Sequence, residues 1–218
     1  MRNAVAGVAV GLALAVGVPV GWELTRPPAT AGAPVAQVLP TDPPAPSSPG
    51  TAAPAPAVDT RAAAPTAVPQ APAPTRVAVP AWGVDAPLDP MGVSPDGQMA
   101  LPEDVDRVGW YRFGPVPGEA GSAVLAGHVD DREQGLGALA PLRDAAVGDE
   151  VLVADEAGTT SRWQVTSREL ITKQELPLDR LFAREGEPRL VLMTCGGPFL
   201  PEYRSYRDNV VVVAEPVR

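Results

Sequence analysis

Short runs of alternating apolar and polar residues dominate the sequence after residue 75. They are "RVAVPAWGV", "SAVLAGHV", "DEVLVADEAGTTSRWQVTS", "PRLVLMTC" and "NVVVVAEPV". Runs of this length and period are typical of β-strands. Only "LGALAPLRDAAVGD" and "PLDRLFARE" indicate short helical turns. We therefore expect residues 76–218 to form one mainly β domain, built as a closed barrel or a sandwich.

Two features of this pattern predict how the strands pair. Val151 and Val153 alternate with polar residues, "DEAG" supplies turn residues, and the alternation resumes at Trp163, which predicts a hairpin. The runs that end at Cys195 and follow Asn209 are apolar at almost every position. Strands buried on both faces have this pattern, so we expect these two to be central.

The first part of the chain has a different character. No charged residue occurs between Asn3 and Trp22, and about 20 residues at 1.5 Å each span a bilayer core of about 30 Å. A cleavable signal peptide is the alternative, but its apolar core is typically about 7–15 residues long. We therefore predict an uncleaved membrane anchor over residues 1–26. With Arg2 on the inner side, we expect a single-pass protein of the cell membrane whose remaining residues lie outside the cell.

Residues 27–75 are rich in proline and alanine. They hold half of the 28 prolines of the chain and only three charged residues. Such a composition offers little to bury and few backbone donors, which predicts an extended, disordered linker. We interpret it as a stalk that carries the following domain through a cell wall.

The charge balance excludes one class of partner. Residues 1–75 carry three arginines and three acidic residues, so the formal net charge of −9 falls on residues 76–218. Nucleic-acid binding depends on lysine and arginine to neutralise phosphates. We therefore expect no nucleic-acid partner.

The only cysteine and the only histidine each stand at the end of an apolar run. Cys195 closes "RLVLMTCGG" and His128 follows "SAVLAG". A lone cysteine excludes an intramolecular disulfide, but it can also be a buried small apolar residue, and a lone histidine is commonly structural. Strand ends, however, hold side chains rigidly where loops admit a substrate. Arg207, just before the last apolar run, is a third candidate, whereas Arg204 is explained equally well as a surface residue.

These three residues form a chemically coherent set. A thiolate at Cys195 is a nucleophile, and His128 can favour its ionisation and later protonate an amine leaving group. Arg207 can stabilise the oxyanion of a tetrahedral intermediate. Gly196 and Gly197 leave backbone amides uncovered beside the sulfur, which adds further donors.

The motifs "AGHVD", "TCGG" and "YRDNVVVVA", behind an anchor and a spacer, resemble the sortases, the cysteine transpeptidases of Gram-positive cell surfaces. The resemblance covers about residues 74–216, and "VPAWGVDAPL" with "DRVGWYRFGPVPGEAGSAVLAGHVD" is closest to the actinobacterial class F group. It implies an eight-stranded sortase-type β-barrel with short helices over residues 76–218. It also implies a catalytic triad of His128, Cys195 and Arg207, with no cofactor.

The resemblance further implies a reaction and its partners. Cys195 would cleave the Thr-Gly bond of an LPXTG-like C-terminal sorting signal on a surface protein and form a thioester. An amine of a peptidoglycan precursor would then accept the protein. Thr194, Gly196 and Gly197 would lie beside the substrate, with the Thr194 side chain on the opposite face of the strand from Cys195. The loop "GGPFLPEYRSYRDN" has Arg204-Ser205 where a Thr-Gly pair is usual. The resemblance therefore does not define the substrate pocket at these positions.

Three acidic residues, Asp130, Asp131 and Glu133, follow His128. Such a cluster is usually a solvated face, although one carboxylate could orient the imidazole.

Three other interpretations compete with a sortase. One histidine and one cysteine do not supply the three ligands of a catalytic zinc, so we expect no metal. The compact S-H-G-C type motif of L,D-transpeptidases is absent. A non-catalytic, surface-displayed binding module would leave the three candidate residues unexplained.

Overall fold

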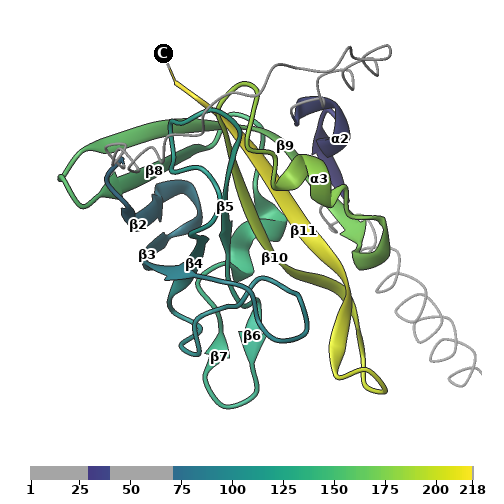
Figure 1. Ribbon diagram of the computed structural model, residues 1–218. Coiled ribbons are helices and arrows are strands. Elements are labelled where there is room, and N and C mark those ends of the chain that lie inside the picture. The colour runs from purple at the N-terminus through teal and green to yellow at the C-terminus, as the bar shows by residue number, and fades with distance from the viewer. Residues whose placement is uncertain (1–28, 40–70, 218) are drawn as a thin grey trace, which may run out of the picture.

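The computed structural model describes residues 29–39 and 71–217 of the chain, in which strands predominate (Figure 1). The strands are β1 (Thr30–Gly32), β2 (Pro74–Val79), β3 (Val84–Met91), β4 (Val108–Tyr111), β5 (Ser122–Ala126), β6 (Asp130–Asp131), β7 (Gly135–Leu136), β8 (Glu150–Asp155), β9 (Thr160–Thr172), β10 (Arg189–Leu200) and β11 (Ser205–Pro216). The helices are short: α2 (Val35–Val38), α3 (Leu178–Leu181) and the 3₁₀ turns η1 (Pro80–Trp82), η2 (Ala140–Asp144) and η3 (Lys173–Glu175).

Eight of these strands close into a barrel. Their order is β9-β11-β10-β5-β4-β3-β2-β8, and the pairing of β8 with β9 closes the ring. Two neighbouring pairs, β5 with β10 and β3 with β4, are parallel, and the other pairs are antiparallel. The predicted eight-stranded barrel is therefore confirmed. A separate small hairpin, β6–β7, lies at one end of the barrel (Figure 1).

The alternation in the sequence predicts the strand pairing well. In the β8–β9 hairpin Val151 is opposite Trp163, as the third apolar run indicates. The uniformly apolar strands β10 and β11 are both central in the sheet. The first helical stretch forms the 3₁₀ turn η2 and the second forms α3, so both are short as expected.

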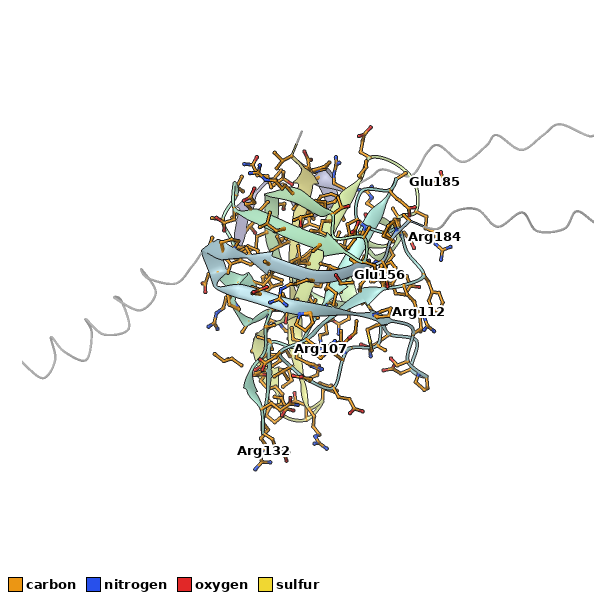
Figure 2. The ribbon with its side chains drawn as sticks, turned by 90° about the vertical axis from the view of Figure 1, so that its left-hand side faces the viewer. Arg107, Arg112, Arg132, Glu156, Arg184 and Glu185 are labelled. Atoms are coloured by element: carbon orange, nitrogen blue, oxygen red, sulfur yellow. The ribbon has the colours of Figure 1, made fainter. Side chains whose placement is uncertain are left out.

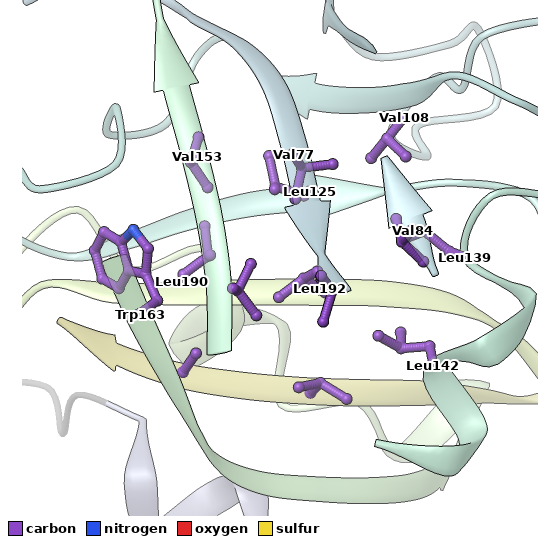
Figure 3. Close-up of a cluster of buried hydrophobic side chains, with 14 of the residues drawn as sticks. Val77, Val84, Val108, Leu125, Leu139, Leu142, Val153, Trp163, Leu190 and Leu192 are labelled. Atoms are coloured by element: carbon purple, nitrogen blue, oxygen red, sulfur yellow. The ribbon is translucent and has the colours of Figure 1, made fainter. Parts of the chain in front are cut away.

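Apolar residues pack on both faces of β10 and β11, which explains their uninterrupted apolar sequences. Leu190, Leu192, Val210 and Val212 belong to the barrel interior, where Trp163 is also fully buried. Figure 3 shows labelled side chains from several strands meeting in this interior. The alternate residues of the two strands face outward and join a second apolar cluster: Val35, Leu39, Val124, Leu181, Val191, Val211 and Val213.

The prediction of a disordered linker is wrong for residues 29–39. β1 adds to the edge of β9, with Thr30 opposite Glu169. In α2, Val35 is fully buried, and Leu39 directly after the helix is 3% exposed. The composition hides this because the segment has few apolar residues, yet these two stand four positions apart and meet the outer apolar cluster together.

Hydrogen bonds also hold this segment on the barrel. The carboxylate of Glu169 accepts the backbone N–H of Val35 at 2.8 Å, and the Ser167 hydroxyl donates to the carbonyl of Ala33 at 2.5 Å. Arg189 donates to the carbonyl of Val38 at 2.9 Å. The remaining part of the predicted linker, residues 40–70, lies outside the described residues.

The predicted membrane anchor, residues 1–26, also lies outside the described residues. In the part of the chain that the structure describes, no helix has the length and apolar character needed to cross a membrane.

Charged side chains project from the outside of the barrel (Figure 2). Arg132 stands at the free end of the β6–β7 hairpin, and Arg184 and Glu185 lie toward the opposite end of the molecule.

Candidate active site

Cys195 and His128 lie just beyond the parallel pairing of two neighbouring strands. His128 follows the end of β5, whereas Cys195 lies within β10, which continues to Leu200, so the prediction that Cys195 ends its strand is wrong. In the β5–β10 ladder Ala126 is opposite Met193, so each candidate follows the last paired residue of its strand by two positions. The next residues continue the contact, since Gly127 N–H donates to the carbonyl of Met193 at 3.1 Å. Both candidate side chains are half-buried. The topology thus brings together two residues that are far apart in the sequence.

Thr194 secures this junction from the other face of β10. Its side chain is buried, and its hydroxyl donates to the carbonyl of Gly127 at 2.8 Å. Because side chains alternate along a strand, this contact places the Cys195 side chain on the opposite face. The Thr194 hydroxyl therefore fixes β10 against β5 beside the histidine.

The imidazole of His128 bonds to a backbone carbonyl. Its Nε2 lies 3.1 Å from the oxygen of Pro102, and a carbonyl only accepts, so Nε2 carries the proton in this contact. Nδ1 is then the basic nitrogen of the neutral ring. The carbonyl of Pro102 therefore orients the imidazole, a role that the sequence suggested for one of the nearby carboxylates.

Two of those carboxylates have other partners. Asp131 accepts the backbone N–H groups of Glu133 and Gln134 at 2.8 and 3.0 Å, and these bonds hold the pKa of its carboxyl below the usual range. Asp130 accepts a hydrogen bond from the hydroxyl of Tyr206 at 2.5 Å.

Arg207 lies on the strand that flanks Cys195 on its other side. In the β10–β11 ladder Cys195 is opposite Asn209, and Arg207 is two residues before Asn209, on the same face of the strand. Its guanidinium donates from Nε and Nη2 to the two carboxylate oxygens of Asp208, at 2.8 and 2.9 Å. This hydrogen-bonded pair raises the pKa of Arg207, so the side chain is a permanent cation. It is 53% exposed, and its other N–H groups are not used by Asp208.

The glycine pair after Cys195 makes room for this arrangement. Gly197 has a φ of +72°, and a Cβ there would stand 2.1 Å from Oδ2 of Asp208. A Cβ on Gly196 would meet Val210 and Leu170 at 2.8 and 2.9 Å. The two glycines thus permit the buried Asp208 carboxylate, and with it Arg207, to approach the strand that bears the nucleophile.

Cys195 borders two hollows of different character. The first, which we call the apolar groove, is lined mainly by apolar side chains: Val93, Met99, Leu101, Tyr111, Ala126, Leu176, Leu178, Phe182 and Met193. The second, which we call the charged hollow, has five charged residues in its lining: Asp130, Arg143, Asp144, Arg168 and Arg207. The nucleophile candidate therefore stands where an apolar and a charged environment meet.

The hydrogen bond between Tyr206 and Asp130 is a site feature that sequence reasoning missed. It raises the pKa of the Tyr206 hydroxyl to about 12, and burial and the Asp130 charge act in the same direction. The ring also packs edge-on against Phe199, with centroids 5.3 Å apart. Because Asp130 is two residues after His128 and Tyr206 directly precedes Arg207, the bond connects the segments that carry the two residues. In the sequence, the only indication of this bond is that Asp130 and Tyr206 stand close to His128 and Arg207.

Comparison with known proteins agrees with this geometry. The Sortase domain family matches residues 77–217, well over half of the chain. The chain belongs to the sortase family. Members of this family are cysteine transpeptidases of cell-wall sorting. Cys195, the single cysteine of this sortase, lies within the matched domain. None of the curated protein sequences compared with the chain matches it.

Solved sortases share the fold of this sortase at low sequence identity. A lid mutant of sortase A from Corynebacterium diphtheriae is 16% identical with a TM-score of 0.51, and the match covers 67% of this chain and 71% of that one. Sortase C-1 from Actinomyces oris is 20% identical with a TM-score of 0.51, covering 66% and 73%. Sortase C1 from Streptococcus suis is 16% identical with a TM-score of 0.51, over the same shares. At these identities the likeness establishes the barrel.

No metal-binding cluster is present in the described part of this sortase, where no group of three or more His, Cys, Asp or Glu residues could hold an ion.

Proposed function

We propose that this sortase cleaves the Thr-Gly bond of an LPXTG-like sorting signal and transfers the cleaved protein to an amine of a peptidoglycan precursor. The observation that carries the proposal is the arrangement of the three candidates on neighbouring strands: His128 two residues after β5, Cys195 in β10 and Arg207 in β11. The triad was expected from the sequence alone, and the register of these strands supports it.

The first step of the proposed reaction forms a thioester. The Cys195 thiolate attacks the carbonyl carbon of the threonine, and N–H groups of Arg207 that Asp208 does not use stabilise the oxyanion. The C–S bond forms, the C–N bond to glycine breaks, and the His128 imidazolium donates a proton to the departing amine. In the second step an acceptor amine replaces the sulfur.

The apolar groove supports a sorting signal as the first substrate. Cys195 is part of its lining, which is mainly apolar and includes Met99, Leu176 and Phe182. A leucine and a proline that precede the scissile bond would bury apolar surface there, at about 25 cal/mol per Å². Such burial orients the threonine carbonyl toward the sulfur.

Two finer parts of the proposal rest on the sequence. The stretches "VPAWGVDAPL" and "DRVGWYRFGPVPGEAGSAVLAGHVD" favour the class F group. The uncharged run over residues 3–22 favours a single-pass anchor in the cell membrane with the barrel outside. In this location the enzyme would meet both surface proteins and lipid-linked wall precursors.

Mass spectrometry tests the proposed chemistry directly. The full-length protein is incubated with LPXTG- and LAXTG-type peptides, with and without hydroxylamine or a glycine amine. We expect Thr-Gly cleavage, a thioester mass on Cys195 and capture of the acyl group by the added amine. Cys195→Ala should abolish all three, and cleavage by this variant would show that the nucleophile is misassigned.

A binding module without chemistry makes the opposite prediction. Its cysteine would not react with iodoacetamide in the folded protein. A catalytic cysteine, in contrast, must be accessible to a substrate.

A further inference from the structure

The apolar groove contains a single charged side chain. Among the described residues that line the groove, only Lys173 carries a charge, and it is also the only lysine of the chain. The domain around it is acidic, since residues 76–218 carry the whole formal net charge of −9. Apolar walls deprive an ammonium group of part of its hydration, and a carboxylate on a ligand would compensate this loss. The groove is therefore suited to a mainly apolar ligand with one negative charge.

The register of the strands places Lys173 near the nucleophile. Ile171 of β9 and Cys195 of β10 are both opposite Asn209 of β11, and Lys173 follows Ile171 by two residues. Neighbouring strands lie about 4.8 Å apart, so the backbone at Lys173 is about 10 Å across the sheet from Cys195. Both residues line the apolar groove. A peptide whose scissile bond meets Cys195 can therefore bring a nearby side chain to Lys173.

A hydrogen bond to Ser205 holds the lysine at the wall of the groove. Nζ of Lys173 donates to the Ser205 hydroxyl at 2.7 Å, which is its only polar partner in the described part of the chain. An ammonium group has three N–H donors, so two remain for a ligand. Ser205 belongs to the Arg204-Ser205 pair, at which this chain departs from the usual Thr-Gly of the class F loop. A glycine at this position has no hydroxyl to accept the bond.

We propose that Lys173 makes this sortase prefer a sorting signal with an acidic residue at the X position of LPXTG. The inference rests on the transpeptidase function proposed above. In that function the leucine and proline bury apolar surface, and the threonine presents its carbonyl to Cys195. X is the only other position before the scissile bond, so it is the one that can carry a charge. A glutamate at X accepts charge-assisted hydrogen bonds from the two remaining donors of Lys173.

Peptides that differ only at X test the proposal. Acetylated and amidated LPETG-, LPQTG- and LPKTG-type peptides are given to the full-length protein, and kcat/KM for Thr-Gly cleavage is measured by mass spectrometry. We expect kcat/KM to be about tenfold higher for glutamate than for its neutral isostere glutamine, the effect of one charge-assisted pair. The lysine peptide should be the poorest substrate. Lys173→Gln should remove the preference, and Lys173→Glu should reverse it in favour of the lysine peptide.

Two further variants identify the cause of the preference. Ser205→Ala removes the hydroxyl that holds Nζ of Lys173 and should reduce the preference several-fold. Arg162→Gln is the control, because it removes one positive charge from a side chain that is 63% exposed at the other end of β9. It should leave the preference unchanged. A preference that survives Lys173→Gln, or an equal gain from a glutamate placed before the leucine, would overturn the proposal.

Carbodiimide crosslinking gives a readout that does not depend on catalysis. In the Cys195→Ala variant the reagent should join the glutamate of the LPETG-type peptide to Lys173 as an amide, which peptide mapping locates because the chain has no other lysine. A scrambled peptide of the same composition should give a much lower yield, and equal yields would contradict the site.

The rate measurements separate this inference from the proposed function. Equal cleavage of all three peptides would contradict only the role of Lys173. The absence of Thr-Gly cleavage and of a thioester on Cys195 with every peptide would contradict the transpeptidase itself, and the inference with it.

Discussion

Arg207 forms two hydrogen bonds with Asp208 and keeps further N–H groups for a ligand. Lysine at this position retains the charge but not the planar fork of donors. We expect Arg207→Lys to reduce the rate of Thr-Gly cleavage at least tenfold, with a melting temperature close to that of the wild type because the side chain is 53% exposed. Arg204→Lys, on the exposed turn of the same hairpin, is the control. A near-full rate for Arg207→Lys would remove Arg207 from the site.

Tyr206 gives the site a measurable pH signature. Its pKa is raised to about 12, first by the hydrogen bond to Asp130, whereas an unfolded tyrosine titrates near 10. The folded state binds this proton more tightly, so the stabilisation is complete below about pH 10 and is lost as the pH rises toward 12. The ultraviolet absorbance of phenolate should show one late-titrating tyrosine, and Tyr206→Phe should remove that step. Tyr203→Phe, 74% exposed, should leave the late step in place.

The sequence predicted the triad but not its supporting contacts. Cys195 and His128 were chosen as candidates because each ends an apolar run in the sequence, and the parallel pairing of β5 with β10 brings these two runs side by side. His128 bonds to the backbone carbonyl of Pro102, and Arg207 pairs with the buried carboxylate of Asp208. Tyr206 donates to Asp130. No periodic pattern encodes such contacts, because they depend on how separate loops are brought together by the closed barrel.

Among the elements, the β1–α2 segment makes the clearest stability prediction. Leu39 is 3% exposed within the outer apolar cluster. Truncating a buried leucine to alanine costs about 2–5 kcal/mol, and we expect about 2 kcal/mol at this peripheral site. Denaturant unfolding of Leu39→Ala measures the loss, and Leu136→Ala, 68% exposed, should change stability by less than about 0.5 kcal/mol. Equal effects of the two variants would show that the segment does not contribute to the fold.

Why β1 and α2 escaped prediction is a matter of local composition. β1 reads "TAG" and has no large side chain, so its pairing with β9 depends on the backbone alone. α2 has four residues, fewer than the two turns over which a helical period can be recognised. The β8–β9 hairpin, by contrast, alternates over both strands and was predicted correctly. Averages over a proline-rich window cannot detect two buried residues, Val35 and Leu39.

For the protein as a whole, this segment changes how the barrel relates to the proposed membrane anchor. Leu39 is buried in the outer apolar cluster, and Ala71 packs against the barrel interior. A chain segment whose two ends are fixed on the same domain cannot set the distance of that domain from a membrane. We therefore expect the distance between the barrel and the membrane not to depend on residues 40–70.

The distance from the membrane would instead depend on residues 23–28. If residues 3–22 span the membrane, only these six residues precede Ala29, which lines the charged hollow. At 3.3–3.6 Å per residue they reach at most about 22 Å, which would hold the charged hollow close to the membrane surface. Twelve Gly and Ser residues inserted within 40–70 should then leave the distance between barrel and bilayer unchanged, whereas the same insertion within 23–28 should lengthen it.

Energy transfer measures this distance in vesicles. The donor is a dye on Tyr203→Cys in a Cys195→Ala background, and the acceptor is a dye on lipid headgroups. The exposed Tyr203 lies on the β10–β11 turn, so labelling there leaves the packed elements intact. Transfer should fall only for the insertion within 23–28, because only that segment joins the span to the barrel. An equal fall for both insertions would restore the stalk interpretation and show that β1 and α2 do not stay on the barrel at the membrane.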